Sequence, residues 1–119
     1  DNSIVDSFRG DGVVIATPTG STSYAMSLGS PILYPTMESN IIVPMAAYRI
    51  GARPLVIPSK YDITAKLTGN SEAVMVLDGQ EEILVKIEDS IKLKKSKSPV
   101  SIVRFKDNFF DRVRTKLRM

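Results

Sequence analysis

Apolar and polar residues alternate along much of this chain with the two-residue period of a β-strand. The clearest case is the stretch 62–68, where Ile63, Ala65 and Leu67 fall on one side. Alternating or apolar stretches predict short strands at 3–8, 13–16, 54–58, 62–68, 73–77, 83–87, 91–93 and 100–105. Two further apolar runs, at 32–35 and 41–44, each end in proline, a residue that belongs at sheet edges or in turns.

Glycine-containing turns separate several of these strands. Gly10-Asp11-Gly12 predicts a hairpin between the first two strands, because glycine adopts the positive φ angles of tight turns. Asp78-Gly79 predicts a second hairpin between the strands on either side of it.

Two helices are predicted, one early and one late. Residues 17–20 break the second strand, and Ser21 or Thr22 can cap a short helix that ends near Gly29. Asn108 can cap a C-terminal helix with an apolar stripe formed by Phe109, Phe110, Val113 and Leu117. The basic residues of that helix are expected to point outward, namely Arg112, Arg114, Lys116 and Arg118.

These elements predict a mostly β, β-sandwich-like fold with eight or nine short strands. A length of 119 residues suits one domain with its own core, so we expect residues 1–119 to form a single domain. The chain opens in a strand pattern with Asp1 rather than Met, and we expect it to be a piece of a longer protein.

Composition narrows the possible chemistry. The chain has no cysteine and no histidine, which excludes disulfides, thiol catalysis and the commonest general base and metal ligand. No apolar run reaches the roughly 18 residues of a membrane helix, so we expect no membrane partner. Residues 92–119 hold 10 basic and 2 acidic side chains, but no aromatic residue is interleaved with the lysines. A solvated basic face therefore fits better than a nucleic-acid partner.

The junction between the second strand and the early helix is the richest candidate site. It carries five hydroxyl side chains within seven residues, on Thr17, Thr19, Ser21, Thr22 and Ser23. A helix needs one capping hydroxyl, so this surplus indicates either elaborate capping or a polar ligand such as a ribose or a phosphate. The segment is not a P-loop, because no Gly-Lys-Ser/Thr follows.

Other candidates each have a structural alternative. Asp11 and Asp78 are either ordinary turn residues or exposed carboxylates that accept bonds from a ligand. Tyr24 is either a core residue or a wall for a planar base. The arginines could bind a phosphate or pair with structural carboxylates, and the candidates are Arg9, Arg49 and Arg53.

The motif Gly-Asp-Gly at 10–12, followed by Thr-Pro-Thr-Gly-Ser-Thr-Ser-Tyr at 17–24, resembles the NAD kinase family. Further agreement comes from Arg-Pro-Leu-Val at 53–56, Asp-Gly-Gln at 78–80 and the terminal Phe109-Phe110. The chain departs from the family pattern at Ser23 in place of alanine, at Ser30 in place of glycine and at the segment 46–48.

The resemblance implies the C-terminal β-domain of an enzyme that phosphorylates the adenosine-ribose 2′-hydroxyl of NAD to give NADP. It implies that the adenosine side is lined by Thr19, Thr22, Ser23, Tyr24 and, close by, Ser27. Asp11 would contact the nicotinamide side, Ala46 would reach the nicotinamide pocket of a neighbouring subunit, and Asp78 would lie near the cleft. The catalytic aspartate would belong to an N-terminal α/β domain that this chain lacks.

By the same resemblance, the whole enzyme would use ATP or polyphosphate together with Mg²⁺ or another divalent cation. We expect this chain by itself to bind no cofactor. It would be a cytoplasmic homo-oligomer, either a dimer or a tetramer. Two alternatives stay open, a lipid kinase of the diacylglycerol or sphingosine type and a non-catalytic nucleotide-binding or assembly module. The hydroxyl motif with its tyrosine argues against the lipid kinase.

Overall fold

The computed structural model describes residues 4–7, 9–48, 52–98, 100–101 and 108–117 of the chain. The chain forms two compact units, one made of Asp1–Ser59 with Ser98–Met119 and the other of Lys60–Lys97.

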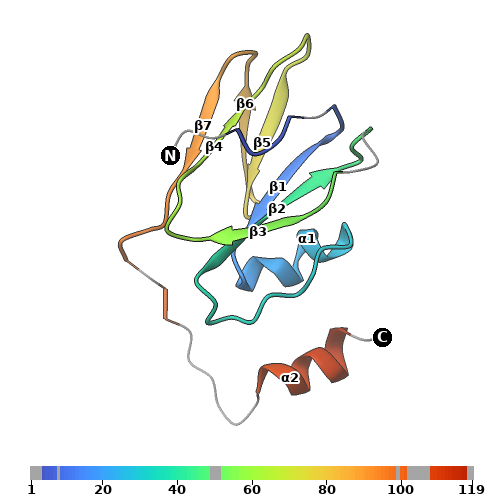
Figure 1. Ribbon diagram of the computed structural model, residues 1–119, viewed down its shortest axis with the longest axis vertical. Helices are drawn as coiled ribbons and strands as arrows, with labels where there is room; N and C mark the ends of the chain where they lie inside the picture. The colour runs from blue at the N-terminus through green and yellow to red at the C-terminus, as the bar shows by residue number, and fades with distance from the viewer. Residues whose placement is uncertain (1–3, 8, 49–51, 99, 102–107, 118–119) are drawn as a thin grey trace. The chain divides into compact units, whose positions relative to one another are not determined.

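The first unit is built on a three-stranded antiparallel sheet in the order β1 (Gly12–Ala16), β2 (Ser39–Met45) and β3 (Leu55–Pro58) (Figure 1). Strand β2 alternates strongly, because Ile41 and Val43 are fully buried while Asn40, Ile42 and Pro44 are only half-buried. Its proline, at position 44, lies beyond the end of β3, where β2 has only β1 beside it. A missing amide hydrogen is tolerated at such an edge position.

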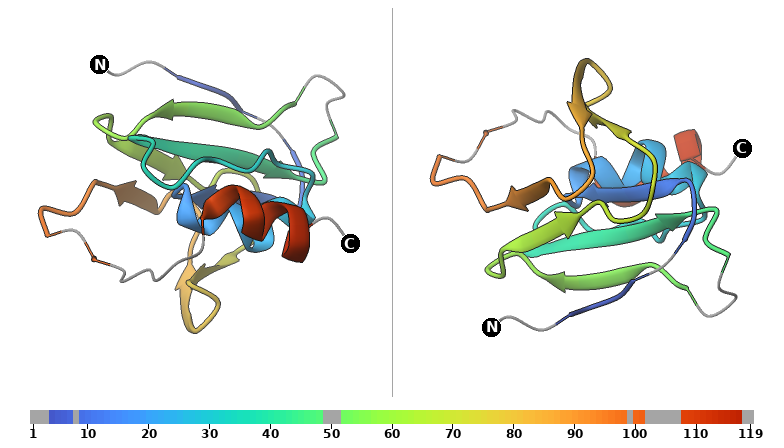
Figure 2. Two further views of the ribbon diagram at one scale, coloured as in Figure 1. Left: turned by 90° about the horizontal axis from the view of Figure 1, so that it is seen from below. Right: turned by 90° about the horizontal axis from the view of Figure 1, so that it is seen from above.

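Two short helical turns lie against one face of this sheet. They are η1 (Thr19–Thr22), a 3₁₀ turn, and α1 (Tyr24–Ser27), and both views in Figure 2 place them on the same side. The core between helix and sheet consists of Ala25, Leu33, Ile41 and Val43. This small core fixes the orientation of the helical turns on the sheet.

The C-terminal helix begins as predicted. The Asn108 side chain accepts a hydrogen bond from the Asp111 amide at 2.8 Å and so caps α2 (Phe109–Arg112). The chain continues as a π-helical segment, η2 (Val113–Leu117). The Phe109 ring contacts the Tyr34 ring edge-on at 5.2 Å, which joins α2 to the loop after α1.

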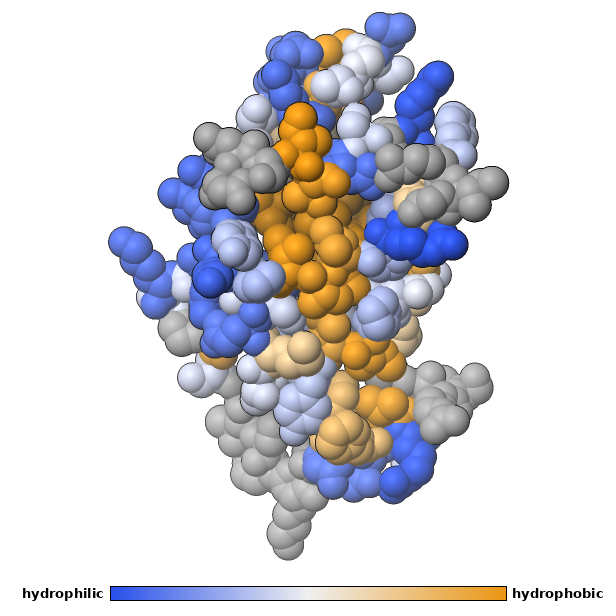
Figure 3. Space-filling view, viewed as in Figure 1, coloured by the Kyte–Doolittle hydropathy of each residue, from blue (hydrophilic) through white to orange (hydrophobic). Residues whose placement is uncertain are grey.

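The second unit contains two antiparallel pairs of strands. Strand β4 (Ile63–Lys66) pairs with β7 (Ser90–Leu93), and β5 (Ala73–Leu77) pairs with β6 (Glu81–Val85). The β5–β6 hairpin exposes apolar side chains, and hydrophobic surface gathers in this part of the molecule (Figure 3). The largest exposed fractions on the hairpin are those of Val74 (57%), Leu84 (56%) and Val76 (53%).

The mostly β class is confirmed, with seven strands in the described residues. The hairpin predicted between 3–8 and 13–16 is wrong, because 4–7 form no strand and β1 pairs with β2 instead. The run 32–35 is not a strand either, since Leu33 packs into the core from a loop. Most of the strand predicted at 100–105 lies outside the described residues.

Candidate functional site

The turn between β1 and α1 uses its hydroxyl groups differently from the prediction. Neither Ser21 nor Thr22 caps the helix, because each side chain donates backward to a carbonyl three residues earlier. The hydroxyl that serves the turn is that of Thr17, which accepts from the Gly20 amide at 3.2 Å. The chain then bends at Ser23, whose φ of −100° and ψ of −128° separate η1 from α1.

Ser21 is a structural residue. Its side chain is fully buried, donates to the Pro18 carbonyl at 2.6 Å and accepts from the Leu33 amide at 3.0 Å. One hydroxyl thus satisfies two buried backbone groups that are 15 residues apart in the chain. The surplus of hydroxyls at this junction is therefore partly explained by the fold itself.

The remaining residues of the junction face outward. Thr19, Ser23 and Ser27 are exposed, and Thr22 is half-buried. Tyr24 is 57% exposed, so the core interpretation of this tyrosine is wrong and its ring is accessible to a ligand. The hydroxyl-bearing surface that the sequence analysis assigned to the adenosine side thus lies together on η1 and α1.

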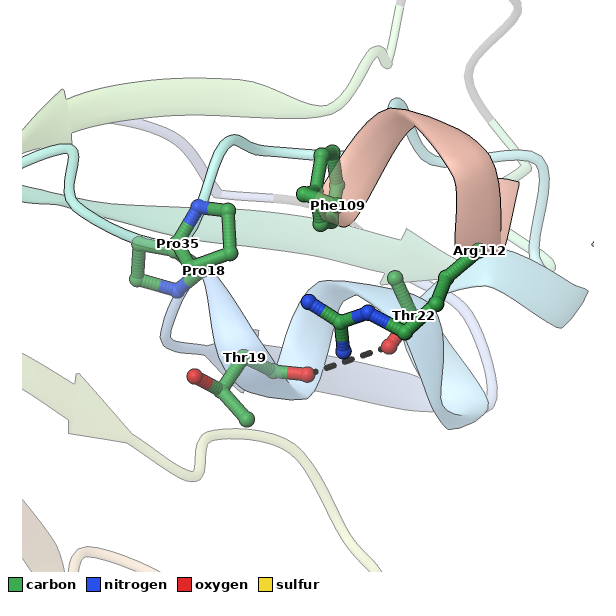
Figure 4. A pocket seen from close by; sticks show the side chains of 6 residues that line it. All are labelled: Pro18, Thr19, Thr22, Pro35, Phe109 and Arg112. Atoms are coloured by element: carbon green, nitrogen blue, oxygen red, sulfur yellow. Dashed lines mark hydrogen bonds between the residues drawn. The ribbon is translucent and has the colours of Figure 1, made fainter. Parts of the chain in front are cut away.

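A pocket of about 80 Å³ lies at this surface (Figure 4). Thr19 and Thr22 line it, and their role in binding adenosine stays a prediction. The other lining residues are Pro18, Pro35, Phe109 and Arg112. Sequence reasoning named none of these four as site residues; Pro18 adjoins Thr19 in the chain, but Pro35 and the two residues of α2 reach the pocket only through tertiary packing.

Arg112 corrects one prediction directly. It was expected on the outward face of the C-terminal helix, but it is half-buried and lines the pocket. Its guanidinium carbon lies 5.7 Å from the centre of the Phe109 ring, which is a cation–π distance. The hydrophobic periodicity of the helix classes arginine as a polar, outward residue. It therefore cannot identify an arginine whose aliphatic part covers apolar surface while its charged group stays polar.

Asp11 and Ala46 come together at the other end of β1. The Asp11 amide donates to the Met45 carbonyl at 2.9 Å, and Ala46 adopts a positive φ of 49°. Gly10 allows this close approach, since a Cβ there would lie 2.7 Å from the Met45 carbonyl oxygen. Both Asp11 and Ala46 are exposed.

These two residues are separated from the hydroxyl-bearing turns by the length of β1. That strand has five residues, which span about 13 Å at roughly 3.3 Å per residue. The first unit therefore offers two separate groups of candidate residues, one at each end of the same strand.

Asp78 belongs to the second unit. It lies in the β5–β6 turn with a φ of 53°, followed by Gly79 at 71°, and the Gln80 amide closes the turn by donating to the Leu77 carbonyl at 3.0 Å. The predicted hairpin is confirmed. The Asp78 side chain is exposed, and its role in a site stays a prediction.

Two of the three arginines named from the sequence lie in the described residues. Arg9 and Arg53 are exposed, and Arg53 donates to the neighbouring Ala52 carbonyl at 3.3 Å. Arg49 lies outside the described residues. Within the part of the chain that the structure describes, no three acidic side chains come together as a possible metal site.

No helix among the described residues is long and apolar enough to span a membrane.

Comparison with known proteins gives a consistent result. The model of the ATP-NAD kinase C-terminal domain family matches residues 1–105. An NAD kinase of Methanosarcina barkeri is 48% identical over 116 residues, covering 96% of this chain and 42% of the relative. An NAD kinase of Methanosarcina acetivorans is 49% identical over 116 residues, again covering 96% of this chain and 42% of the relative. The chain thus spans about two fifths of the length of these relatives.

Solved structures agree with these matches. The crystal structure of an NAD kinase from Archaeoglobus fulgidus in complex with ATP superimposes with a TM-score of 0.79 at 34% identity, covering 92% of this chain and 43% of the other. The yeast NADH kinase complexed with NADH gives a TM-score of 0.73 at 29% identity, covering 77% of this chain and 27% of the other.

Proposed function

Because the chain belongs to the ATP-NAD kinase C-terminal domain family, we propose that it is the NAD-binding part of an NAD kinase. The whole enzyme would transfer a phosphoryl group from ATP or polyphosphate to the adenosine-ribose 2′-hydroxyl of NAD. The observation that carries the proposal is the exposed hydroxyl-bearing surface of η1 and α1, at the family's Thr-Pro-Thr-Gly-Ser-Thr motif.

The geometry of the first unit suits a ligand with two ends. Thr19, Thr22 and Tyr24 would bind the adenosine side, with Ser23 and Ser27 beside them. An exposed tyrosine ring stacks on a planar base, and hydroxyls hydrogen-bond a ribose. At the other end of β1, the exposed Asp11 carboxylate can accept a hydrogen bond from an amide N–H group, and nicotinamide carries such an amide.

This chain would hold the dinucleotide rather than perform the chemistry. Without histidine or cysteine it offers no nucleophile–base pair, and we assign no catalytic residue to it. An N-terminal α/β domain would supply the catalytic aspartate. The enzyme would need Mg²⁺ or another divalent cation with ATP, but the described residues form no site that fits a cation, so we derive no step through it.

The donor and the redox state of the substrate rest on the relatives alone. The Archaeoglobus fulgidus enzyme is in complex with ATP, which supports ATP as the donor. The yeast enzyme is complexed with NADH, so a reduced dinucleotide is also compatible with this fold.

We further propose a homo-oligomeric, cytoplasmic protein, either a dimer or a tetramer, with Ala46 reaching a neighbouring subunit's nicotinamide pocket. The exposed Val74, Val76 and Leu84 on the β5–β6 hairpin support a protein interface, because clustered apolar surface is costly in water. Light scattering of the full-length protein should give a multiple of the monomer mass, and a monomeric mass would contradict this proposal.

The activity is tested by measuring NADP formation from ATP, Mg²⁺ and NAD. The full-length protein should form NADP, whereas the 119-residue chain alone should not. A full-length protein that phosphorylates a lipid instead would favour the diacylglycerol or sphingosine kinase interpretation. A full-length protein that binds NAD without any transfer would favour a non-catalytic module.

The binding residues are tested by titrating NAD into Asp11→Ala and a matched control. We expect Asp11→Ala to weaken binding by about tenfold, because one charged hydrogen bond is lost. Asp6→Ala removes another exposed carboxylate of the same unit, whose side chain bonds the Ser7 amide at 2.8 Å, and should bind NAD like wild type. Equal affinity of wild type and Asp11→Ala would remove Asp11 from the site.

A further inference from the structure

The pocket at η1 contains a cationic side chain that the dinucleotide site assigned above does not use. Arg112 lines this pocket from α2, while Thr19 and Thr22 line it from η1. Figure 4 shows the Arg112 side chain extending from α2 toward these two threonines. The C-terminal helix therefore brings a positive charge to the surface expected to bind adenosine.

The guanidinium group is held in a defined position. Its carbon lies 5.7 Å from the centre of the Phe109 ring, and Phe109 is itself fixed by its edge-on contact with Tyr34 at 5.2 Å. A guanidinium held by an aromatic ring loses less conformational freedom when it binds a ligand.

The composition of the pocket suits a phosphate group. A guanidinium presents its N–H donors in a planar fork that matches two oxygens of one phosphate. The hydroxyls of Thr19 and Thr22 are the further polar groups of the lining, and the rest of the lining is apolar. An apolar wall keeps water away and strengthens the charged contact.

The size of the pocket also suits a single phosphate group. Its volume of about 80 Å³ is far below the roughly 300 Å³ at which pockets for whole small-molecule ligands begin. It has room for one compact group of the size of a few water molecules. A pocket of this size is a subsite for one group of a larger ligand that extends over the surrounding surface.

We propose that Arg112 binds a phosphate group of the adenine nucleotide at this junction, with the Thr19 hydroxyl as an additional hydrogen-bond donor. The proposal rests on the proposed function and deepens it. The phosphate comes either from the pyrophosphate of NAD or from ATP, and the chemistry of recognition is the same for both. Arg112 is a binding residue here, and no proton transfer is assigned to it.

The test compares nucleotides with a nucleoside that lacks phosphate. Calorimetric titrations of NAD, ATP and adenosine are made into full-length wild type, Arg112→Met, Arg112→Lys and Arg114→Met. Arg114 is the matched control, since it lies on the same helical segment with a side chain 69% exposed.

We expect Arg112→Met to raise the Kd for NAD or for ATP by about tenfold to a hundredfold, because a hydrogen-bonded charge is lost. The Kd for adenosine should change by less than about twofold, and Arg114→Met should leave all three affinities within that limit. Arg112→Lys keeps the positive charge but not the planar pair of N–H donors, so its nucleotide affinity should lie between those of Arg112→Met and wild type. The nucleotide whose affinity falls identifies the source of the phosphate.

Three results would overturn the proposal. In the first, Arg112→Met binds NAD and ATP as wild type does. In the second, it weakens adenosine as much as the nucleotides, which is the behaviour of a purely structural tie between α2 and η1. In the third, Arg114→Met weakens nucleotide binding as much as Arg112→Met does. Each of these is distinct from failure of the proposed function, which would appear as the absence of NADP formation by wild type.

Discussion

Removing the buried hydroxyl of Ser21 should destabilise the domain more than any other single-atom change at the junction. The Ser21→Ala variant leaves the Leu33 amide without the hydroxyl to which it donates at 3.0 Å, while the Pro18 carbonyl keeps only its bond from the Ser21 amide at 3.2 Å. Ser21 is 0% exposed and Leu33 is 6% exposed, so water does not replace the lost bonds. An unsatisfied buried amide costs about 1–3 kcal/mol, so we expect the free energy of unfolding to fall by about that amount.

Such a loss is a large part of the stability of a small domain, which is about 5–15 kcal/mol. The free energy of unfolding is obtained from urea titrations of the 119-residue chain followed by circular dichroism. Hydrogen exchange of the Leu33 amide reports on the same bond directly and should become faster in the variant.

Ser27→Ala provides the matched control for Ser21→Ala. Ser27 is an exposed residue of α1, and alanine is a good helix former, so the free energy of unfolding should change by less than about 0.5 kcal/mol. A Ser21→Ala variant within about 0.5 kcal/mol of wild type, with an unchanged exchange rate at Leu33, would contradict the structural role of this hydroxyl.

Three further changes test the backbone of the first unit by thermal unfolding. Gly10→Ala places a Cβ 2.7 Å from the Met45 carbonyl oxygen and should cost about 1–3 kcal/mol, and an unchanged Tm would contradict that close approach. In Gly29→Ala the new Cβ meets no atom within 4 Å, but the alanine must adopt a φ of 81°, so we expect a smaller loss of stability, about 1 kcal/mol. A loss larger than that of Gly10→Ala would contradict this ranking of the two variants. Asn108→Ala removes the cap of α2 and should lower stability by about 1 kcal/mol with a loss of helical ellipticity, whereas unchanged ellipticity would argue against the cap.

Much of the fold could be predicted because the signals are local. The strand at 73–77 and the Asp78-Gly79 turn follow from alternation and from residues that adopt positive φ, and the structure has both. The Asn108 cap is equally local, since a side chain bonds an amide three residues away. The hydroxyl motif at 17–24 likewise identified the exposed turns that carry the family's pattern.

Tertiary structure decided the remaining features, because each depends on residues far apart in the chain. Alternation does not specify a partner strand, and β1 pairs with β2, more than 20 residues later, rather than with the segment at 4–7 just before it. The Ser21 hydroxyl is buried where it accepts from the Leu33 amide of a later loop, whereas the Thr22 hydroxyl lies at the pocket. Arg112 turns inward because the rings of α2 pack on the loop after α1, and no helical period contains that contact. The sequence by itself therefore determined the local elements and the family motif, whereas long-range packing determined which side chains line the pocket.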